Sequence, residues 1–190
     1  MATPNDATSV REIYRPYVES SAISFEVTVP ETQEMATRIQ SVLPTYPWLI
    51  AEDADDVLGY AYAHPFASRA AYQWSVETSI YVRTDSQGRG VGKALLSALL
   101  ELLRAQRFAE AFAGIALPNE KSVRLHEALG FVPVALYRRV GWKRGAWHDV
   151  QWWQCTIDDT HGVHPFEPIA LRELDASTVQ QILTSKRADL

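Results

Sequence analysis

Cysteine is nearly missing from this chain, and so are the spacings that would hold a metal ion. Cys155 is the single cysteine among 190 residues, so neither a disulfide within the chain nor a cysteine-based zinc site can form. The five histidines show no metal-ligand spacing. No apolar run approaches the roughly 20 residues that span a bilayer, and the polar N-terminal segment lacks the hydrophobic core of a signal peptide. We therefore expect a cytoplasmic protein without a metal.

An excess of positive charge is also missing. The chain carries 18 lysines and arginines against 23 aspartates and glutamates, a formal charge of −5. Such a chain has no general attraction for nucleic acid or anionic membrane, so a bound anion must be held by a local patch. Arg83, Arg89 and Lys93 against the single Asp85 predict one. Apolar residues, in contrast, make up 47% of the chain, which predicts one globular domain with a sizeable core.

The most informative stretch joins an alternating segment to an amphipathic one. Over residues 76–82 apolar side chains alternate with polar ones, the period of a strand with two different faces. Over residues 91–107 leucines recur at the spacing of a packed helix. The pattern predicts a strand, a short turn and a long helix, with Glu77 on the polar strand face.

The turn between them, residues 87–93, contains three glycines. Glycine permits positive φ angles and lets a ligand approach backbone amides closely. These amides open a helix, so their unpaired N–H groups and the positive end of the helix dipole predict a pyrophosphate site. A tight turn without a ligand is the alternative. Gln87 and Ala94 exclude a Walker loop, and Lys93 excludes a dinucleotide-binding fingerprint.

The rest of the chain predicts further strands and helices around this unit. We expect helices from about residue 8 and at 31–43, a hairpin of 47–51 and 57–63, a strand at 112–117, a helix at 120–129, and last strands at 131–138 and 148–157 joined by a turn at 141–145. This order suits an α/β domain at 1–157, with a mixed sheet covered on both faces. Residues 158–190 are expected to be a polar C-terminal extension with a weak helix near 175–186, without chemistry of its own.

Short blocks along residues 2–155 follow the pattern of a known family. They are Tyr17-Val18-Glu19 with Ser24-Phe25-Glu26, Tyr46-Pro47-Trp48-Leu49, residues 69–77, Leu117-Pro118-Asn119, residues 122–131 and residues 145–150. With the Gln-x-x-Gly-x-Gly pattern of 87–92, they resemble the phosphinothricin acetyltransferase family of the GNAT superfamily of N-acetyltransferases. The resemblance implies the GNAT fold, a central mixed, mostly antiparallel sheet with helices on both faces. Relatives usually have an edge strand before the segment matching 2–6, and here we expect it to be missing.

The resemblance also implies acetyl-CoA as co-substrate. Backbone N–H groups of the central strand would hold the pantetheine arm and polarise the thioester carbonyl, and the turn would take the pyrophosphate. Asn119 and Ser122 would reach the pantetheine and the sulfur end, although Asn119 could also be an ordinary helix cap. The implied coenzyme residues are Ser79, Ile80, Tyr81, Val82, Gln87, Gly88, Arg89, Gly90, Val91, Gly92, Lys93, Asn119 and Ser122.

Glu77 is the candidate general base. An α-amine, with a pKa near about 8, is mostly protonated at neutral pH and attacks a thioester only as the free base, so a group must accept its proton. Glu77 could do so directly or through water, or could be a solvated strand residue. His126, which the resemblance places close to the active site, is the second catalytic candidate, or else a packing residue.

The acetyl acceptor is expected beside Phe25, Glu26, Arg69 and Tyr72. Arg69 offers two parallel donors to a substrate carboxylate, and the other three could wall the pocket. Ala67 stands where relatives that acetylate phosphinothricin often have a basic residue, so the particular amine stays open.

The predicted function is transfer of the acetyl group of acetyl-CoA to the α-amine of a small amino acid or analogue. Phosphinothricin and methionine sulfoximine or sulfone are the leading acceptors, attacked directly with Glu77 as base. A polyamine or a protein N-terminus is the alternative acceptor, although a polyamine pocket would favour acidic groups over Arg69. A non-catalytic CoA-binding module is the alternative from another class. The resemblance further implies a homodimer, with the aromatic last strands as a possible interface.

Overall fold

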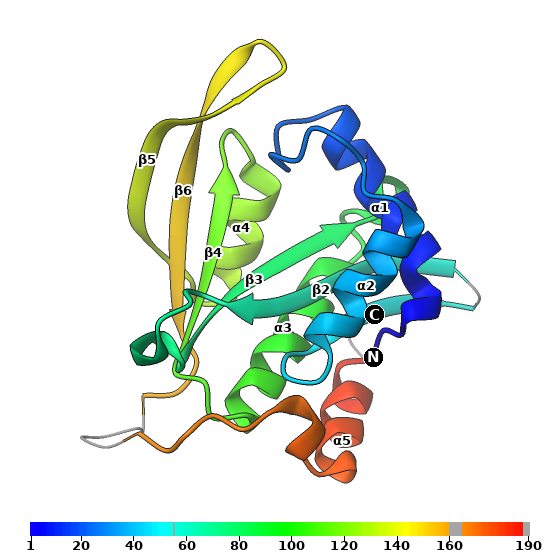
Figure 1. Cartoon of the computed structure of the whole chain (residues 1–190), viewed down its shortest axis with the longest axis vertical. Coiled ribbons are helices and arrows are strands. Elements are labelled where there is room, and N and C mark those ends of the chain that lie inside the picture. Colours follow the sequence, from blue (N-terminus) through cyan, green and yellow to red (C-terminus); the bar gives the residue numbers. More distant parts are fainter. Residues whose placement is uncertain (55, 160–164, 188–190) are drawn as a thin grey trace.

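A six-stranded mixed sheet forms the centre of the molecule, in the order β1-β2-β3-β4-β6-β5 (Figure 1). The computed structural model describes residues 1–54, 56–159 and 165–187. The strands are β1 Trp48–Asp53, β2 Asp56–Pro65, β3 Ser75–Val82, β4 Glu110–Ala116, β5 Val132–Lys143 and β6 Ala146–Thr156. Each neighbouring pair is antiparallel except β3 and β4, which are parallel. The predicted mixed, mostly antiparallel sheet is confirmed.

Helices cover both faces of this sheet. They are α1 Ala7–Glu19, α2 Thr32–Val42, α3 Val91–Ala105, α4 Glu120–Ala128 and α5 Ala176–Arg187. Figure 1 shows α1 and α2 in front of the sheet and α3 behind it. In front, Val10 and Ile39 pack on Trp48 and Tyr60, whereas the leucines of α3 form the second core behind. No helix among the described residues is long and apolar enough to cross a membrane.

The divergence of β3 from β4 positions the site. The two strands are paired only over three positions, from Ser75 with Glu110 to Glu77 with Phe112. Beyond them β3 stays with β2 as far as Val82, and β4 stays with β6. The sheet therefore splits into two halves that separate like a V, which Figure 1 shows between the arrows of β3 and β4.

The sheet has no strand before α1 in the part of the chain that the structure describes. The chain enters through a short 3-10 helix, Pro4–Asp6, and β1 is the edge strand. The Ala2 N–H donates to the Trp48 carbonyl at 2.8 Å, which ties the N-terminal segment to that edge. The missing first strand that the sequence predicted is thus confirmed.

The last hairpin is longer than predicted. We expected a turn at 141–145, but β5 continues to Lys143 and only Arg144 and Gly145 turn, both with positive φ. Gly141 lies within β5, opposite His148. A side chain would not fit there, because an added Cβ would stand 2.2 Å from the Phe25 ring. The glycine at 141 thus marks a close contact between two segments and not a turn, and the sequence alone does not distinguish the two cases.

Apolar side chains also lie outside the two cores. The predicted weak C-terminal helix, α5, packs Val179, Ile182 and Leu183 against the core beneath α3, so the extension supports the helix that opens at the glycine turn.

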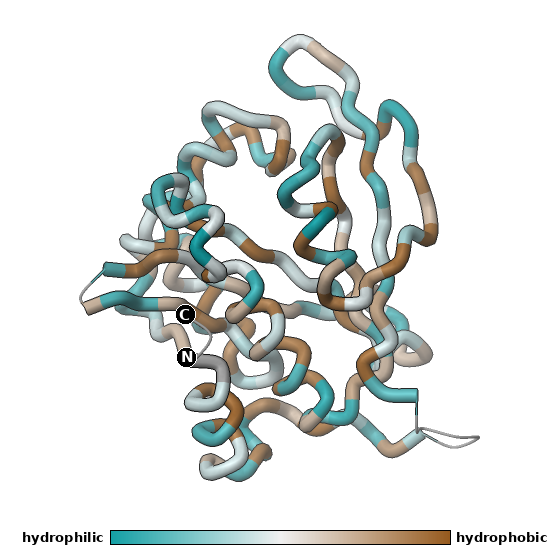
Figure 2. Tube along the Cα trace, turned by 180° about the vertical axis from the view of Figure 1, so that it is seen from behind, coloured by the Kyte–Doolittle hydropathy of each residue, from teal (hydrophilic) through white to brown (hydrophobic). Residues whose placement is uncertain are grey.

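Figure 2 shows brown, apolar stretches along the outer strand β5 as well. There Val132, Val134, Tyr137 and others are exposed.

Candidate active site

A cleft of about 740 Å³ lies where β3 and β4 separate. Its walls are residues 78–82 of β3 and 113–116 of β4, and it is closed by the turn before α3 and by α4. The lining residues that the sequence predicted are Ser79, Ile80, Tyr81, Val82, Gln87, Gly88, Gly90, Gly92, Lys93, Asn119, Ser122 and His126. Arg89 and Val91 belong to the same turn but not to this lining. The cleft thus collects nearly all of the predicted coenzyme residues.

Alternate backbone N–H groups of β3 point into the cleft. The Arg83 N–H donates to Leu58 on β2, and successive residues of a strand direct their backbone groups to opposite edges. The N–H groups of Val82, Ile80 and Thr78 are therefore directed away from β2. The Val82 N–H meets the Tyr17 hydroxyl at 3.4 Å, whereas the Ile80 N–H lies beyond the last β3–β4 pair and faces the cleft. Those of Ser79 and Tyr81 are directed to β2, so only part of the predicted backbone set is available to a ligand.

Two glycines of the turn adopt conformations that other residues rarely take. Gly88 has φ 78° and Gly90, the N-cap of α3, has φ 91°. No side chain caps this helix, so its first N–H groups are open to an anion. Gly92 is different, since it is helical and an added Cβ would meet the Leu125 side chain at 3.2 Å. It allows α3 and α4 to approach each other beside the cleft.

The positive patch expected around the turn is smaller than predicted. Arg89 lies 3.5 Å from Asp53, and Arg83 lies 3.7 Å from Asp56, besides its 2.7 Å pair with Asp85. The two added carboxylates end β1 and begin β2, on either side of the turn between these strands, so folding pairs two arginines that look free in the sequence. The cations that line the cleft are Lys93, Lys121 and Arg124.

Among the lining residues that the sequence analysis missed are Tyr17 and Lys121, which hold the turn in place. The Tyr17 hydroxyl donates to the Val82 carbonyl, and the Gln87 amide donates to that hydroxyl at 3.0 Å. The Lys121 ammonium donates to Gln87 Oε1, the side-chain oxygen, at 2.8 Å. Gln87 therefore bridges α1 and α4 across the mouth of the turn. The Tyr17-Val18-Glu19 block was a signal for Tyr17, but nothing in it pointed to the cleft.

The start of α4 forms the far wall of the cleft. The Asn119 side chain accepts from the Ser122 N–H at 3.3 Å, so it caps this helix. His126 is buried, and its Nδ1 lies 2.8 Å from the Ser122 carbonyl, which only a donor N–H can satisfy. Burial lowers the pKa of the His126 imidazole, opposed by that hydrogen bond. A neutral ring packed edge-to-face on Phe131 favours the packing role of the two considered.

Glu77 lies at the vertex of the cleft, one residue before its lining begins at Thr78. Its side chain is on the α1 and α2 face, 27% exposed, with Oε2 3.9 Å from His64 Nε2 on β2. Burial raises the pKa of the Glu77 carboxyl, and the charge of His64 acts in the opposite direction. Such a carboxyl is poised to take a proton. The described residues contain no group of three His, Cys, Asp or Glu that could hold a metal ion.

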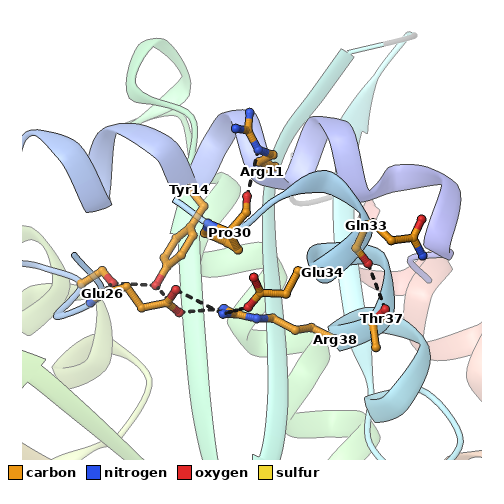
Figure 3. A network of polar contacts seen from close by, with 9 residues as sticks. Arg11, Tyr14, Glu26, Pro30, Gln33, Glu34, Thr37 and Arg38 are labelled. Carbon is orange, nitrogen blue, oxygen red and sulfur yellow. Dashed lines mark hydrogen bonds and ion pairs between the residues drawn. The ribbon is translucent and has the colours of Figure 1, made fainter. Parts of the chain in front are cut away.

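Glu26 is held in a polar network in front of the sheet (Figure 3). Arg38 donates to both Glu26 oxygens, at 2.7 and 3.2 Å, and also pairs with Glu34. Tyr14 donates to Glu26 at 3.1 Å, and burial raises the pKa of Tyr14 to about 12, so it stays a neutral donor. Glu26 is therefore compensated, and it shapes the front wall beside Phe25 without a free charge.

The remaining predicted substrate residues lie at the other end of β3. Arg69 is exposed and begins the 3-10 helix Ala70–Tyr72, in the loop before β3. Tyr72 is partly exposed with its ring 5.9 Å from that of Phe66, which stacks on Phe112. Neither Arg69 nor Tyr72 lines the cleft itself. Tyr72 is connected to Phe112, the partner of Glu77 on β4, through the Phe66 ring. Arg69 stands on the same loop, and its side chain has no ion pair among the described residues.

The described geometry agrees with what this chain matches among known proteins. The family model of the acetyltransferase (GNAT) domain matches residues 1–152, and the chain belongs to this family of acetyl-CoA-dependent N-acetyltransferases. It is 39% identical over 168 residues to phosphinothricin N-acetyltransferase of Streptomyces viridochromogenes, covering 88% of this chain and 92% of that one. Over 155 residues it is 35% identical to the L-methionine sulfoximine/L-methionine sulfone acetyltransferase of Salmonella typhimurium, covering 81% and 91%.

A solved structure with acetyl-CoA has the same fold. The phosphinothricin acetyltransferase of Sinorhizobium meliloti in complex with acetyl-CoA superposes with a TM-score of 0.84 at 36% identity, covering 88% of this chain and 92% of that one. The GNAT fold, the acetyltransferase class and acetyl-CoA as co-substrate, which the sequence predicted, are confirmed.

Proposed function

We propose that this enzyme acetylates the α-amine of a small amino acid or amino-acid analogue, with phosphinothricin and methionine sulfoximine or sulfone as the leading acceptors. The names of the relatives support this choice of acceptor. The observation that carries the proposal is the placement of a half-buried Glu77 at the vertex where β3 and β4 separate. A carboxylate there faces the acceptor side of the sheet, one residue from the cleft.

The cleft would hold the coenzyme by its two ends. The open N–H groups at the start of α3, beyond Gly90, suit a pyrophosphate. The Ile80 N–H, and the Val82 N–H if it exchanges its long 3.4 Å bond to the Tyr17 hydroxyl, suit the carbonyl oxygens of the pantetheine arm. A backbone N–H directed to the thioester oxygen would stabilise the charge that develops on attack. Arg83 and Arg89 are paired with aspartates. Lys93 and Lys121, which line the cleft, would therefore supply the positive charge for the pyrophosphate.

Glu77 would make the amine a nucleophile. It takes one proton from the ammonium group, and the nitrogen lone pair then bonds to the thioester carbonyl carbon. When the tetrahedral intermediate collapses, the carbon–sulfur bond breaks and the second nitrogen proton goes to the sulfur. The products are the N-acetyl amino acid, free thiol and one proton held by Glu77. His126, neutral and hydrogen-bonded, would shape the wall next to the reacting atoms.

The acceptor's own carboxylate would pair with Arg69. The cation nearest to the front wall, Arg38, is already shared between Glu26 and Glu34, whereas Arg69 makes no ion pair with another described residue. Its guanidinium has the two parallel donors that a carboxylate matches. This arrangement favours α-amino acids over polyamines, which lack a carboxylate.

A thiol-release screen tests the proposed function. The enzyme is incubated with acetyl-CoA and, separately, phosphinothricin, methionine sulfoximine, methionine sulfone, a polyamine and a short peptide. Turnover with the amino-acid analogues at kcat/KM at least about 100-fold above the other two supports the proposal. A preference for the polyamine or the peptide would contradict the acceptor, and acetyl-CoA binding without turnover on any amine would indicate a non-catalytic module.

We also propose a homodimer that forms through the last hairpin. β5 is an edge strand with many exposed apolar side chains: Val132, Val134, Leu136, Tyr137, Val140 and Trp142. Exposed apolar surface on an edge strand is typical of a protein interface. Sedimentation of the wild type should give a dimer, and Val134→Lys on β5 should give a monomer. A wild-type monomer at high concentration would contradict this interface.

A further inference from the structure

His64 and Glu77 face each other across the β2–β3 ladder. They are directly opposite in the register, and His64 Nε2 lies 3.9 Å from Glu77 Oε2. Both side chains are partly accessible, 34% and 27%. No other carboxylate–imidazole pair occurs among the ion pairs of the described residues.

The backbone orients the His64 ring toward this carboxyl. His64 Nδ1 lies 3.1 Å from the Pro65 carbonyl, and a carbonyl only accepts, so Nδ1 carries the hydrogen in this contact. In the neutral ring Nε2 then has a free lone pair, and it is the atom directed to Glu77. A lone pair facing a carboxyl group can take a proton from it once Glu77 has been protonated.

Space for water adjoins the same histidine. A second cavity, of about 210 Å³, is lined by His64, Tyr62, Trp48 and Arg38 together with residues of α1 and α2. The buried Trp48 Nε1 has no hydrogen-bond partner among the described residues, and a buried donor of this kind is commonly satisfied by an ordered water. The cavity is large enough for that, and Arg38, Ser41 and His64 bring polar side chains to its mostly apolar lining.

We propose that His64 is a proton relay, which accepts from Glu77 the proton taken from the substrate amine and releases it to water. The proposal rests on the function of Glu77 proposed above. The Glu77 O–H bond breaks as the His64 Nε2–H bond forms, and the imidazolium then loses a proton to water. Because 3.9 Å exceeds hydrogen-bond distance, the transfer needs a small side-chain rotation or one bridging water. His64 acts through Glu77 and is a positioning residue.

The charged and titratable groups around the pair are compatible with this relay. From β2, Tyr62 lies beside His64 with ring centroids 6.0 Å apart. From α1 and α2, Tyr14 and Arg38 line the adjoining cavity, and Glu26 balances Arg38. On β4, the residue opposite Glu77 is the uncharged Phe112. Positive charge on His64 opposes the rise that burial causes in the pKa of Glu77, so a protonated His64 disfavours return of the proton to Glu77.

The test is a pH profile of kcat/KM for wild type and His64→Gln. Glutamine cannot take up a proton, so the pKa of Glu77 should rise and the acidic limb of the profile should move to higher pH. We expect kcat to fall about 10-fold, less than for loss of a primary base, with an unchanged Kd for acetyl-CoA. An unchanged limb and unchanged kcat would overturn the relay.

Chemical rescue separates a relay from a structural role. His64→Ala leaves a partly exposed gap, and added imidazole should restore at least about a third of the lost kcat while Glu77→Gln gains nothing from it. Slow His64→Ala enzyme that does not respond to imidazole would overturn the relay. If instead Glu77→Gln itself turns over normally, the proposed base fails, and that result is distinct from the failure of His64 alone.

Discussion

Glu77 on β3 and Phe112 on β4 are the last pair that these two parallel strands share. Beyond this pair the strands separate, and the freed edge of β3 lines the cleft. The carboxylate is thus held on regular, hydrogen-bonded structure next to the point where backbone donors become available. The proposed base and the proposed acyl-binding site are brought within one residue of each other by a single break in strand pairing.

The first prediction concerns this carboxylate in catalysis. Glu77→Gln should lower kcat by about 100-fold or more, because the amine loses its proton acceptor, while calorimetry should find unchanged acetyl-CoA affinity. Glu127→Gln, an exposed glutamate on α4, is the matched control and should turn over normally. Near-normal turnover by Glu77→Gln would remove Glu77 as the base.

The second prediction concerns the same substitution and stability. Because burial raises the pKa of Glu77 in the folded state, the native chain binds the proton more tightly than the unfolded chain, and stability falls as pH rises through that interval. Glu77→Gln resembles the protonated form, so it should raise the Tm at pH 8. The gain should vanish below about pH 4, the ordinary range of a glutamate. A lower Tm at pH 8 would contradict a desolvated carboxylate.

The third prediction concerns the glycine turn. Gly90 has φ 91°, so Gly90→Val costs about 1–3 kcal/mol in backbone strain and should displace the amides that open α3. Acetyl-CoA binding should be lost in calorimetry while the fold persists. Gly130→Val is the control, since Gly130 has φ 86° after α4 and open space around it. Equal effects of both variants on binding would refute the turn as the phosphate site.

The fourth prediction concerns recognition of the acceptor. Arg69→Ala should raise KM for the amino acid by about 10-fold or more, since a bidentate ion pair is lost, and should leave KM for acetyl-CoA nearly unchanged. Arg172→Ala, exposed on the far C-terminal segment, should change neither constant. Equal increases in both KM values would show that Arg69 does not bind the carboxylate of the amino-acid substrate.

The fifth prediction concerns the last hairpin and the wall that carries Phe25. Lys143 is buried, and its ammonium donates to the Val18 and Ser24 carbonyls at 2.7 Å each. Lys143→Met leaves both carbonyls without this donor, at a cost of about 1–3 kcal/mol. We expect a lower Tm than that of the wild type. We also expect KM for the amine to rise more than KM for acetyl-CoA. Arg144→Ala removes only an exposed hydrogen bond to the Glu19 carbonyl, and it should have little effect on Tm. If it lowers Tm as much as Lys143→Met does, the two buried hydrogen bonds of Lys143 are not what stabilises this region.

Much of the site could be predicted because its signals are local. The alternation over 76–82 and the glycines of 87–93 report backbone conformation within a few residues, and the structure places these segments as a strand and as the turn that opens α3. Burial and ion pairing, in contrast, join segments far apart in the chain. Arg89 looked like a free cation until the fold placed Asp53 beside it, and the Tyr17 contact with Val82 spans 65 residues.

The amino-acid sequence alone determined the strand, turn and helix unit, the presence of a carboxylate on its polar face, and the family. Only the tertiary structure decided that β3 leaves β4 after Glu77, that His64 faces this carboxyl, and that Gln87 bridges α1 and α4. The reason is physical: the period of side chains depends on local backbone geometry, whereas strand register and cross-strand pairs depend on how distant segments pack together.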